Sequence, residues 1–257
     1  MLNEKTRAEH LITSGEPSSD AKSAMSLLTR YYAQVHGLGI YEICEETRRY
    51  LVRAWPSISL QYVDSHLRRY AERATDRPLV MLDHVAITGR ELECISKLKG
   101  IRVQCLAFAA LAISKYDCLR CQRSSCWIQE HQFGEIIRRA NITVSENDAA
   151  LLLHQMLEAG MIEMSHSMSR GSFRILFAET DGTSIPLIKL EDADFLDLGY
   201  AYRANKGDPF VRCEECRRWV KKSRNGRTRF CKNCATNNHK KHALAYANRK
   251  KSSQTEI

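Results

Sequence analysis

Apolar side chains recur at three- and four-residue spacing through the first third of the chain, and this period predicts amphipathic helices. The predicted helices are, in chain order, residues 21–36, 40–54 and 59–77. Gly37 interrupts the pattern after the first helix, and Pro56 ends the second because the residue before a proline disfavours the helical conformation. The pattern therefore predicts a helical unit over residues 21–78, preceded by a flexible lead-in over residues 1–20.

The pattern changes after Pro78. Residues 79–87 are rich in apolar and β-branched side chains and predict a strand. Thr88 stands three positions before Glu91, the spacing of a capping box, so a helix is predicted to begin there and continue through Lys97.

Residues 100–177 carry a clear succession of helices and strands. Helices are predicted at 101–116, 132–140 and 148–159. Ser145 is a candidate N-cap for the last of these helices, and Gly160 is a candidate stop. Residues 161–168 and 173–177 alternate between apolar and polar positions, so they predict a β-hairpin.

Three helices followed by a hairpin resemble the winged helix-turn-helix family. The string LLLHQMLEAGMIEM in particular resembles the passage from the third helix of that family to its first wing strand. The resemblance implies a winged-helix-like domain over residues 79–178. The acidic, loop-rich residues 179–202 are then predicted to be a linker, and the fold class is mainly α (α+β).

Charge is distributed unevenly along the 257 residues. The chain has a formal net charge of +9, yet residues 203–251 hold sixteen Lys or Arg against three acidic residues, while residues 1–202 have a net charge of −3. This asymmetry predicts a basic module for a polyanion at residues 203–257, attached to a nearly neutral body.

Two Cys-x-x-Cys pairs lie in the basic module. Cys213 and Cys216 are separated by fourteen residues from Cys231 and Cys234. Four thiolates suit tetrahedral zinc, and a site filled by cysteine alone leaves no position for water, so a structural zinc ribbon is predicted. Asn225-Gly226 predicts a hairpin turn between these pairs, with residues 218–220 and 228–230 as its two strands.

The string CRRWVKKSRNGRTRFCKNCATNNHKKHALAYANRKK resembles the zinc finger with a trailing basic helix that is seen in some bacterial regulators and phage proteins. The whole arrangement resembles uncharacterised DNA-binding proteins of phages and prophages of Gram-positive bacteria.

The density of positive charge in this module predicts contacts with nucleic-acid phosphates, because each neutralised phosphate releases counterions. The candidate contact residues are Arg217, Arg218, Lys221, Lys222, Arg224, Arg227, Arg229, Lys240 and Lys241. A basic face that serves only solubility is the plainer alternative.

A second cluster of potential ligands follows the predicted helix 101–116. Cys118, Cys121, Cys126 and His131 have spacings similar to those of a zinc knuckle. Three thiolates and an imidazole would make a closed zinc site. A surface loop that is merely rich in cysteine is the alternative.

The predicted helix 148–159 argues against a simple DNA-reading role for the winged-helix-like domain. Glu146, Asp148 and Glu158 would repel phosphates, and no Lys or Arg lies between Ser145 and Ala159. Asn147, His154 and Gln155 could still contact base edges, while arginines on neighbouring elements could bind the backbone: Arg138, Arg139, Arg170 and Arg174. DNA reading and protein–protein contact both stay open.

No phosphate-binding glycine loop, nucleophile elbow or His-Glu-x-x-His helix is present, so no enzymatic activity is predicted. Neither a secretory signal nor a membrane span is predicted, which places the protein in the cytoplasm. The expected function is nucleic-acid binding, with DNA as the first candidate, in a regulatory or accessory role. The alternative is a phage-type adaptor or inhibitor that docks on a host nucleoprotein or defence complex.

Overall fold

A computed structural model describes residues 2–18, 20–165, 171–179, 185–223 and 225–252, with the backbone alone at residue 242 and from residue 244 onward. The chain divides into two compact units, Met1–Asp83 and His84–Ile257. Helices dominate both units and the sheets are small and antiparallel, which confirms the predicted α+β class.

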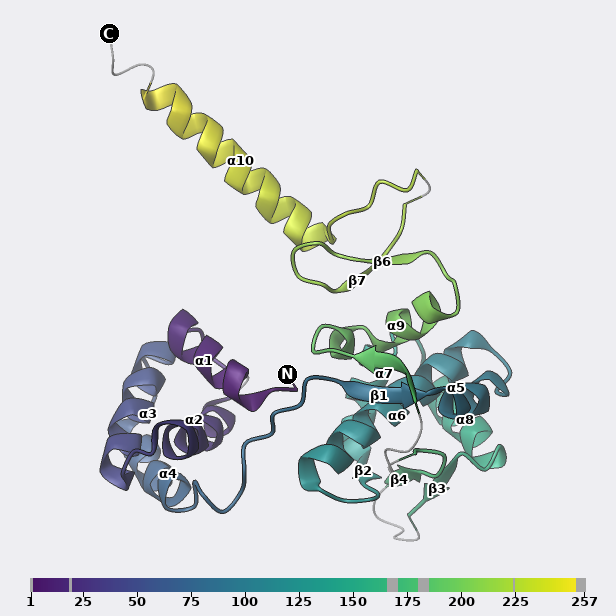
Figure 1. Cartoon of the computed structure of the whole chain (residues 1–257), viewed down its shortest axis with the longest axis horizontal. Coiled ribbons are helices and arrows are strands. Elements are labelled where there is room, and N and C mark those ends of the chain that lie inside the picture. Colours follow the sequence, from purple (N-terminus) through teal and green to yellow (C-terminus); the bar gives the residue numbers. More distant parts are fainter. Residues whose placement is uncertain (1, 19, 166–170, 180–184, 224, 253–257) are drawn as a thin grey trace. The chain divides into compact units, whose positions relative to one another are not determined.

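The first unit is a bundle of four helices (Figure 1). They are α1 (Glu4–Ser14), α2 (Ala21–His36), α3 (Ile40–Ala54) and α4 (Leu60–Glu72). The predicted helices correspond to α2, α3 and α4. Their apolar faces meet in a core that includes Met25, Leu28, Leu51, Val63 and Leu67.

Helix α1 lies within the segment that the sequence analysis treats as a flexible lead-in. Asn3 caps this helix by accepting a hydrogen bond from the Thr6 amide, and Ala8 and Leu11 are buried in the core of the bundle. The sparse apolar positions of residues 1–20 thus suffice for one helix, because the other three helices supply its packing surface.

The predicted strand at residues 79–87 divides between the two units. Its first part pairs with the N-terminus, where the Glu4 amide donates to the Val80 carbonyl at 2.7 Å and Asn3 forms a bridge with Met81. Its second part is β1 (Val85–Thr88) in the second unit, which pairs with β5 (Pro186–Leu190). A single strand over these residues was therefore a wrong prediction, because the partners of its two halves are different segments.

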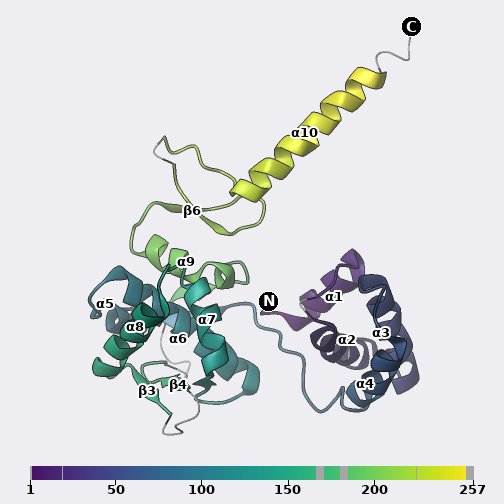
Figure 2. The ribbon, with the colours of Figure 1, turned by 180° about the vertical axis from the view of Figure 1, so that it is seen from behind.

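The second unit is built around α6 (Ile101–Cys121), whose side chains from Cys105 to Lys115 are all buried. Four helices pack against it: α5 (Gly89–Ser96), α7 (Glu130–Arg139), α8 (Glu146–Glu158) and α9 (Leu198–Asn205). Figure 2 shows these helices grouped around α6 from the side opposite to Figure 1.

A three-stranded sheet completes this part of the unit. It contains β2 (Trp127–Ile128), β3 (Ile162–Met164) and β4 (Phe173–Ile175), in the order β2-β4-β3. The predicted hairpin corresponds to β3 and β4, while its turn at residues 166–170 lies outside the described residues. Strand β2 has no counterpart among the predicted elements, because two residues are too few to show a periodic pattern.

The predicted linker over residues 179–202 includes packed structure. After β5 come the short helix η1 (Asp194–Leu196) and α9, and Phe195, Leu198 and Tyr202 are buried. Beyond α9 follow β6 (Phe210–Arg212), β7 (Trp219–Lys221) and α10 (Lys232–Ser252).

Candidate metal centre

Four cysteines meet where β6, β7 and α10 come together. Cys213 directly follows β6, Cys216 lies in the turn before β7, and Cys231 and Cys234 stand at the beginning of α10. Their sulfur atoms all lie within 4.8 Å of one another. The predicted four-cysteine cluster is therefore confirmed as a group that could hold one metal ion.

The sulfur geometry fits zinc. A Zn–S bond of about 2.3 Å in a tetrahedron places neighbouring sulfurs about 3.8 Å apart. The Sγ atoms of Cys216 and Cys231, which come from different pairs, are 3.7 Å apart. Four sulfur donors with no water position describe a structural site, so zinc would stabilise this segment.

The turn at Cys213 to Cys216 has the backbone that brings two sulfurs to one side. The Arg217 amide donates to the Cys213 carbonyl at 2.9 Å, and the Cys213 amide donates to the Arg218 carbonyl at 2.8 Å. Arg217 has φ +62°, a left-handed conformation that costs a residue with a Cβ about 1 kcal/mol. This strained conformation lets the turn direct both thiols toward the same point.

Backbone amides favour a thiolate at Cys213. Burial of this side chain raises its pKa, but hydrogen bonds from the amides of Cys216, Cys231 and Glu215 outweigh burial and lower the pKa to about 6. The Cys231 amide, for example, lies 3.3 Å from the Cys213 sulfur. The thiolate is the form that binds metal, so the backbone prepares one ligand in advance.

The pKa values of Cys216 and Cys234 shift in the opposite direction. Hydrogen bonding to Cys231 raises the pKa of Cys234, and burial raises the pKa of Cys216. Several adjacent thiolates repel one another, whereas a bound dication favours them all. The donor set is therefore the one that a metal ion would complete.

The strands of this module differ from those predicted. β7 pairs with β6, so the hairpin encloses the Cys213 to Cys216 turn, and residues 228–230 form no strand. One backbone hydrogen bond, from the Glu214 amide to the Arg229 carbonyl, joins that segment to the turn. The prediction that residues 218–220 pair with residues 228–230 was wrong. The metal-binding turn instead brings residues 210–212 beside β7, and these two segments pair. Gly226 does adopt the left-handed conformation expected in a turn, with φ +70°.

Two buried aspartates attach this hairpin to the rest of its unit. Asp194 accepts hydrogen bonds from the Trp219 indole at 2.6 Å and the Arg212 guanidinium at 2.9 Å. Asp197 accepts two from Arg218, at 2.8 and 2.9 Å. Sequence reasoning missed both carboxylates as partners of the module, because they lie in the predicted linker. The available signal was that both aspartates stand among the apolar residues Phe195, Leu196 and Leu198.

The nine predicted phosphate contacts fall into different environments. Arg218 is bound to Asp197, Arg229 forms a two-point ion pair with Glu214, and Lys241 lies 3.6 Å from Glu215. Arg224 lies outside the described residues. The remaining side chains are exposed and have no ion pair with a carboxylate in the described part of the chain: Arg217, Lys221, Lys222, Arg227 and Lys240.

The second predicted cluster is only partly assembled. Burial, together with the neighbouring Cys118 thiol, raises the pKa of Cys126 to about 12. Cys121 and His131 are exposed. Among described residues, the C-terminal cysteines form the only group of three or more His, Cys, Asp or Glu side chains with all ligand atoms within 4.8 Å. A second zinc site stays a prediction without preformed geometry.

Arginines of the helical body are similarly engaged. Arg138 and Arg139 both pair with Glu135, and Arg174 pairs with Glu163 and lies over the Trp127 ring. Arg170 lies outside the described residues. On α8, Leu151 and Leu157 are exposed alongside Glu146 and Glu158.

Comparison of the chain with models of known protein families, with curated proteins and with solved structures finds no match. Within the described residues, no helix is long and apolar enough to cross a membrane.

Proposed function

We propose that the protein binds nucleic acid, DNA first, through a C-terminal zinc ribbon that contacts phosphates. The observation that carries this proposal is the group of exposed cations beside the four-cysteine centre. Lys221 and Lys222 lie at the end of β7, and Arg217 is held in the metal-binding turn itself. A bound zinc would fix the backbone that carries these side chains, so that contacts with phosphates need less further ordering.

The winged-helix assignment is part of the proposal. The order expected of a winged helix is a helix, a strand, two helices and two strands. The last strand of that fold lies in the middle of the sheet. Elements α6, β2, α7, α8, β3 and β4 follow this order. The acidic surface of α8 favours an auxiliary or protein-contacting role for this part, with the ribbon as the main phosphate contact.

The proposed setting is the cytoplasm, where cysteines stay reduced and available to metal. We propose a regulatory or accessory role without catalysis.

The first test measures binding of the full chain to duplex DNA and to RNA of the same sequence by fluorescence anisotropy at several salt concentrations. Lys221→Glu with Lys222→Glu should weaken binding to DNA and reduce the slope of log K against log salt by about 1.8, the value for two phosphate contacts. Lys97→Glu with Lys99→Glu is the matched control, since these exposed lysines carry the same charge but lie outside the ribbon. Equal slopes for the two double variants would contradict the proposal.

The metal is tested separately. Wild-type protein should contain one zinc per chain at the C-terminal site by elemental analysis, and Cys231→Ser should lose it together with most DNA affinity. Retention of both zinc and affinity in Cys231→Ser would remove the ribbon from the interface.

The second candidate is an adaptor or inhibitor that docks on a host nucleoprotein or defence complex. The exposed Leu151 and Leu157 beside the acids of α8 favour it, because apolar side chains on a surface helix are typical of protein contacts. Full-length protein that contains zinc but binds neither DNA nor RNA would favour this candidate.

A further inference from the structure

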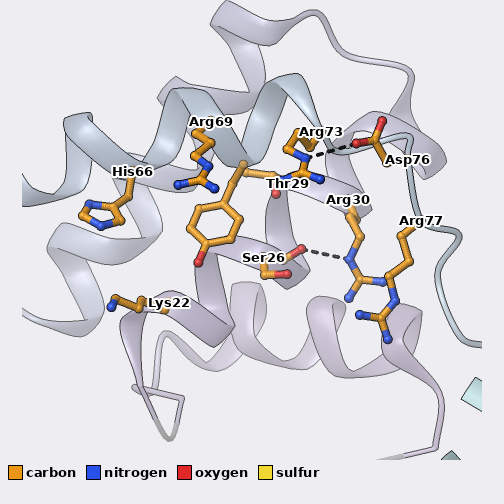
Figure 3. Close-up of a pocket in the computed structure, with 10 residues that line it drawn as sticks. Lys22, Ser26, Thr29, Arg30, His66, Arg69, Arg73, Asp76 and Arg77 are labelled. Atoms are coloured by element: carbon orange, nitrogen blue, oxygen red, sulfur yellow. Dashed lines mark hydrogen bonds and ion pairs between the residues drawn. The ribbon is translucent and has the colours of Figure 1, made fainter. Parts of the chain in front are cut away.

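A hollow with a volume of about 520 Å³ opens between α2 and α4 in the first unit. Figure 3 shows cationic side chains from both helices and from the segment after α4 around it. The cations are Lys22, Arg30, Arg69, Arg73 and Arg77. Asp76 is the sole carboxylate among the described residues of the wall, so positive charge dominates this space.

The sequence places these cations together by helical spacing. On α2, Lys22, Ser26 and Arg30 follow one another at four-residue intervals. His66 and Arg69 on α4 and Arg73 directly after it do so at intervals of three and four. Residues at such spacings share one face of a helix. The apolar faces of the same helices enter the core, and their polar edges therefore line a common groove.

Two of the five cations already have carboxylate partners. The buried Arg30 guanidinium binds Glu4 through two hydrogen bonds of 2.7 and 2.8 Å, and Arg73 lies 3.2 Å from Asp76. Lys22, Arg69 and Arg77 have no ion pair with a carboxylate in the part of the unit that the structure describes. Three cations are thus available to an incoming anion.

Elsewhere in the first unit, several arginines have carboxylate partners, whereas Arg7 and Arg53 bind the uncharged oxygens of Ser18 and Ile12. Outside the hollow, Arg48 pairs with Asp64, Arg49 with Glu46, and Arg68 with Glu72. Like charges gathered in a hollow with low-dielectric walls raise its positive potential, which an anion relieves.

We propose that this hollow binds a small ligand that carries a polyphosphate group. Guanidinium groups match phosphate oxygens through paired, charge-assisted hydrogen bonds. Three available cations exceed what a single phosphate dianion neutralises, which favours a diphosphate or triphosphate. The volume falls within the range of about 300–1,000 Å³ of small-ligand sites, and Tyr70 supplies an aromatic part of the wall.

Titration calorimetry of the full chain with inorganic tripolyphosphate at low salt tests the proposal. Arg69→Gln with Arg77→Gln should weaken binding at least about ten-fold, because each lost guanidinium removes charge-assisted hydrogen bonds. Arg68→Gln is the matched control, since Arg68 neighbours Arg69 on α4 but does not line the hollow. This control should bind within about two-fold of wild type, and all three proteins should show the same thermal unfolding.

The ribbon needs its own control because it is also basic. Lys221→Glu with Lys222→Glu should leave tripolyphosphate binding unchanged if the hollow is the site. No binding by wild-type protein at millimolar tripolyphosphate would overturn the proposal, as would binding that persists in Arg69→Gln with Arg77→Gln.

A binding measurement with a single-stranded oligonucleotide tests whether the hollow binds nucleic acid and not a small polyphosphate ligand. If Arg69→Gln with Arg77→Gln weakens oligonucleotide binding while wild-type protein ignores tripolyphosphate, the hollow belongs to a nucleic-acid interface and the small-ligand proposal fails.

Discussion

At the scale of single residues, the carboxylate of Glu4 joins α1 to two other parts of its unit. It binds the Arg30 guanidinium on α2 and accepts a hydrogen bond from the Val80 amide at 2.9 Å. Burial raises the pKa of Glu4, but the hydrogen bonds from Arg30 and Val80 and the charge of Arg77 outweigh burial and lower it below the ordinary value of 4.5. The lowered pKa means that folding favours the charged form.

This shift predicts how the first unit responds to acid. A carboxylate with a lowered folded-state pKa stabilises the fold above its unfolded value of 4.5 and loses that contribution as the pH falls through the folded value. Glu4→Gln should lower the free energy of unfolding by about 3 kcal/mol at neutral pH, since it leaves Arg30 without its partner, and by less in acid. Urea unfolding followed by circular dichroism at both pH values checks this.

Glu9→Gln is the control for Glu4→Gln, because Glu9 lies exposed on the same helix. An equal loss of stability in the two variants would contradict a specific role for Glu4.

At Gly199 the backbone of α9 lies so close to the end of α7 that only glycine fits. A Cβ at this position would lie 1.7 Å from the carbonyl oxygen of Ala140, directly after α7. Gly199→Ala should destabilise the second unit by roughly 3 kcal/mol, because α9 must move away from α7. Thermal unfolding of Gly199→Ala measures this loss.

Gly134→Ala, a substitution in α7, should have the opposite effect on stability. Gly134 lies inside α7, and a Cβ there meets nothing within 4 Å. The substitution should stabilise by about 0.5–1 kcal/mol through helix propensity. Destabilisation by Gly134→Ala as large as that by Gly199→Ala would contradict the steric explanation.

At the scale of elements, the β6–β7 hairpin connects the metal centre to the rest of the second unit. Its turn supplies Cys213 and Cys216, while Arg212, Arg218 and Trp219 on and beside its strands bind buried aspartates. Arg218 therefore ties the hairpin to Asp197 in the described conformation. A metal ion bound at its turn and the carboxylates at its strands would together support the hairpin.

Asp197→Ala should loosen this attachment without removing the metal ligands. We expect a loss of roughly 1–2 kcal/mol, since Arg218 is partly exposed and the solvent weakens the pair. Hydrogen exchange at the amides of β6 and β7 should become faster while zinc content stays constant.

Asp208→Ala is the control for Asp197→Ala, because Asp208 forms a more exposed pair with Arg203. Equally slow exchange in both variants would contradict a role of Asp197 in holding the hairpin.

Elements with long apolar periods were predicted well, whereas short ones were not. Helices α2, α3, α4 and α8 each carry a repeated apolar face, and α6 carries a long apolar run. The segments 79–82 and 228–230 have strand-like composition, but pairing with the N-terminus and the proximity of β6 to β7 decide their conformations. Strand formation depends on a partner that local sequence does not identify.

At the scale of the whole molecule, the first unit has a core of its own. Every residue of its apolar cluster lies between Ala8 and Leu79. Residues 1–83 expressed alone should therefore unfold cooperatively in urea and show the far-UV circular dichroism of a helical protein. A gradual transition, or a spectrum typical of an unfolded chain, would contradict an independent unit.

Positive charge gathers at two places in the chain. The sequence shows the first, the basic module after residue 202, because its cations are close neighbours along the chain. The second, the hollow between α2 and α4, combines Lys22 with Arg69 and Arg77, which about fifty residues separate. The net charge of the first unit does not reveal such a group, since residues 1–83 hold eleven Lys or Arg and eleven acidic residues.

The sequence by itself determined the helical class, the candidate zinc ligands and the basic character of the C-terminal module. Each of these rests on local spacing: the helical period, the Cys-x-x-Cys pairs and a run of cations with few acids. The tertiary structure alone decided that the four sulfurs meet, that β6 pairs with β7, that Asp194 and Asp197 hold the ribbon, and that cations of α2 and α4 share a hollow. These features join residues distant in the chain, and packing of the helices brings such residues together.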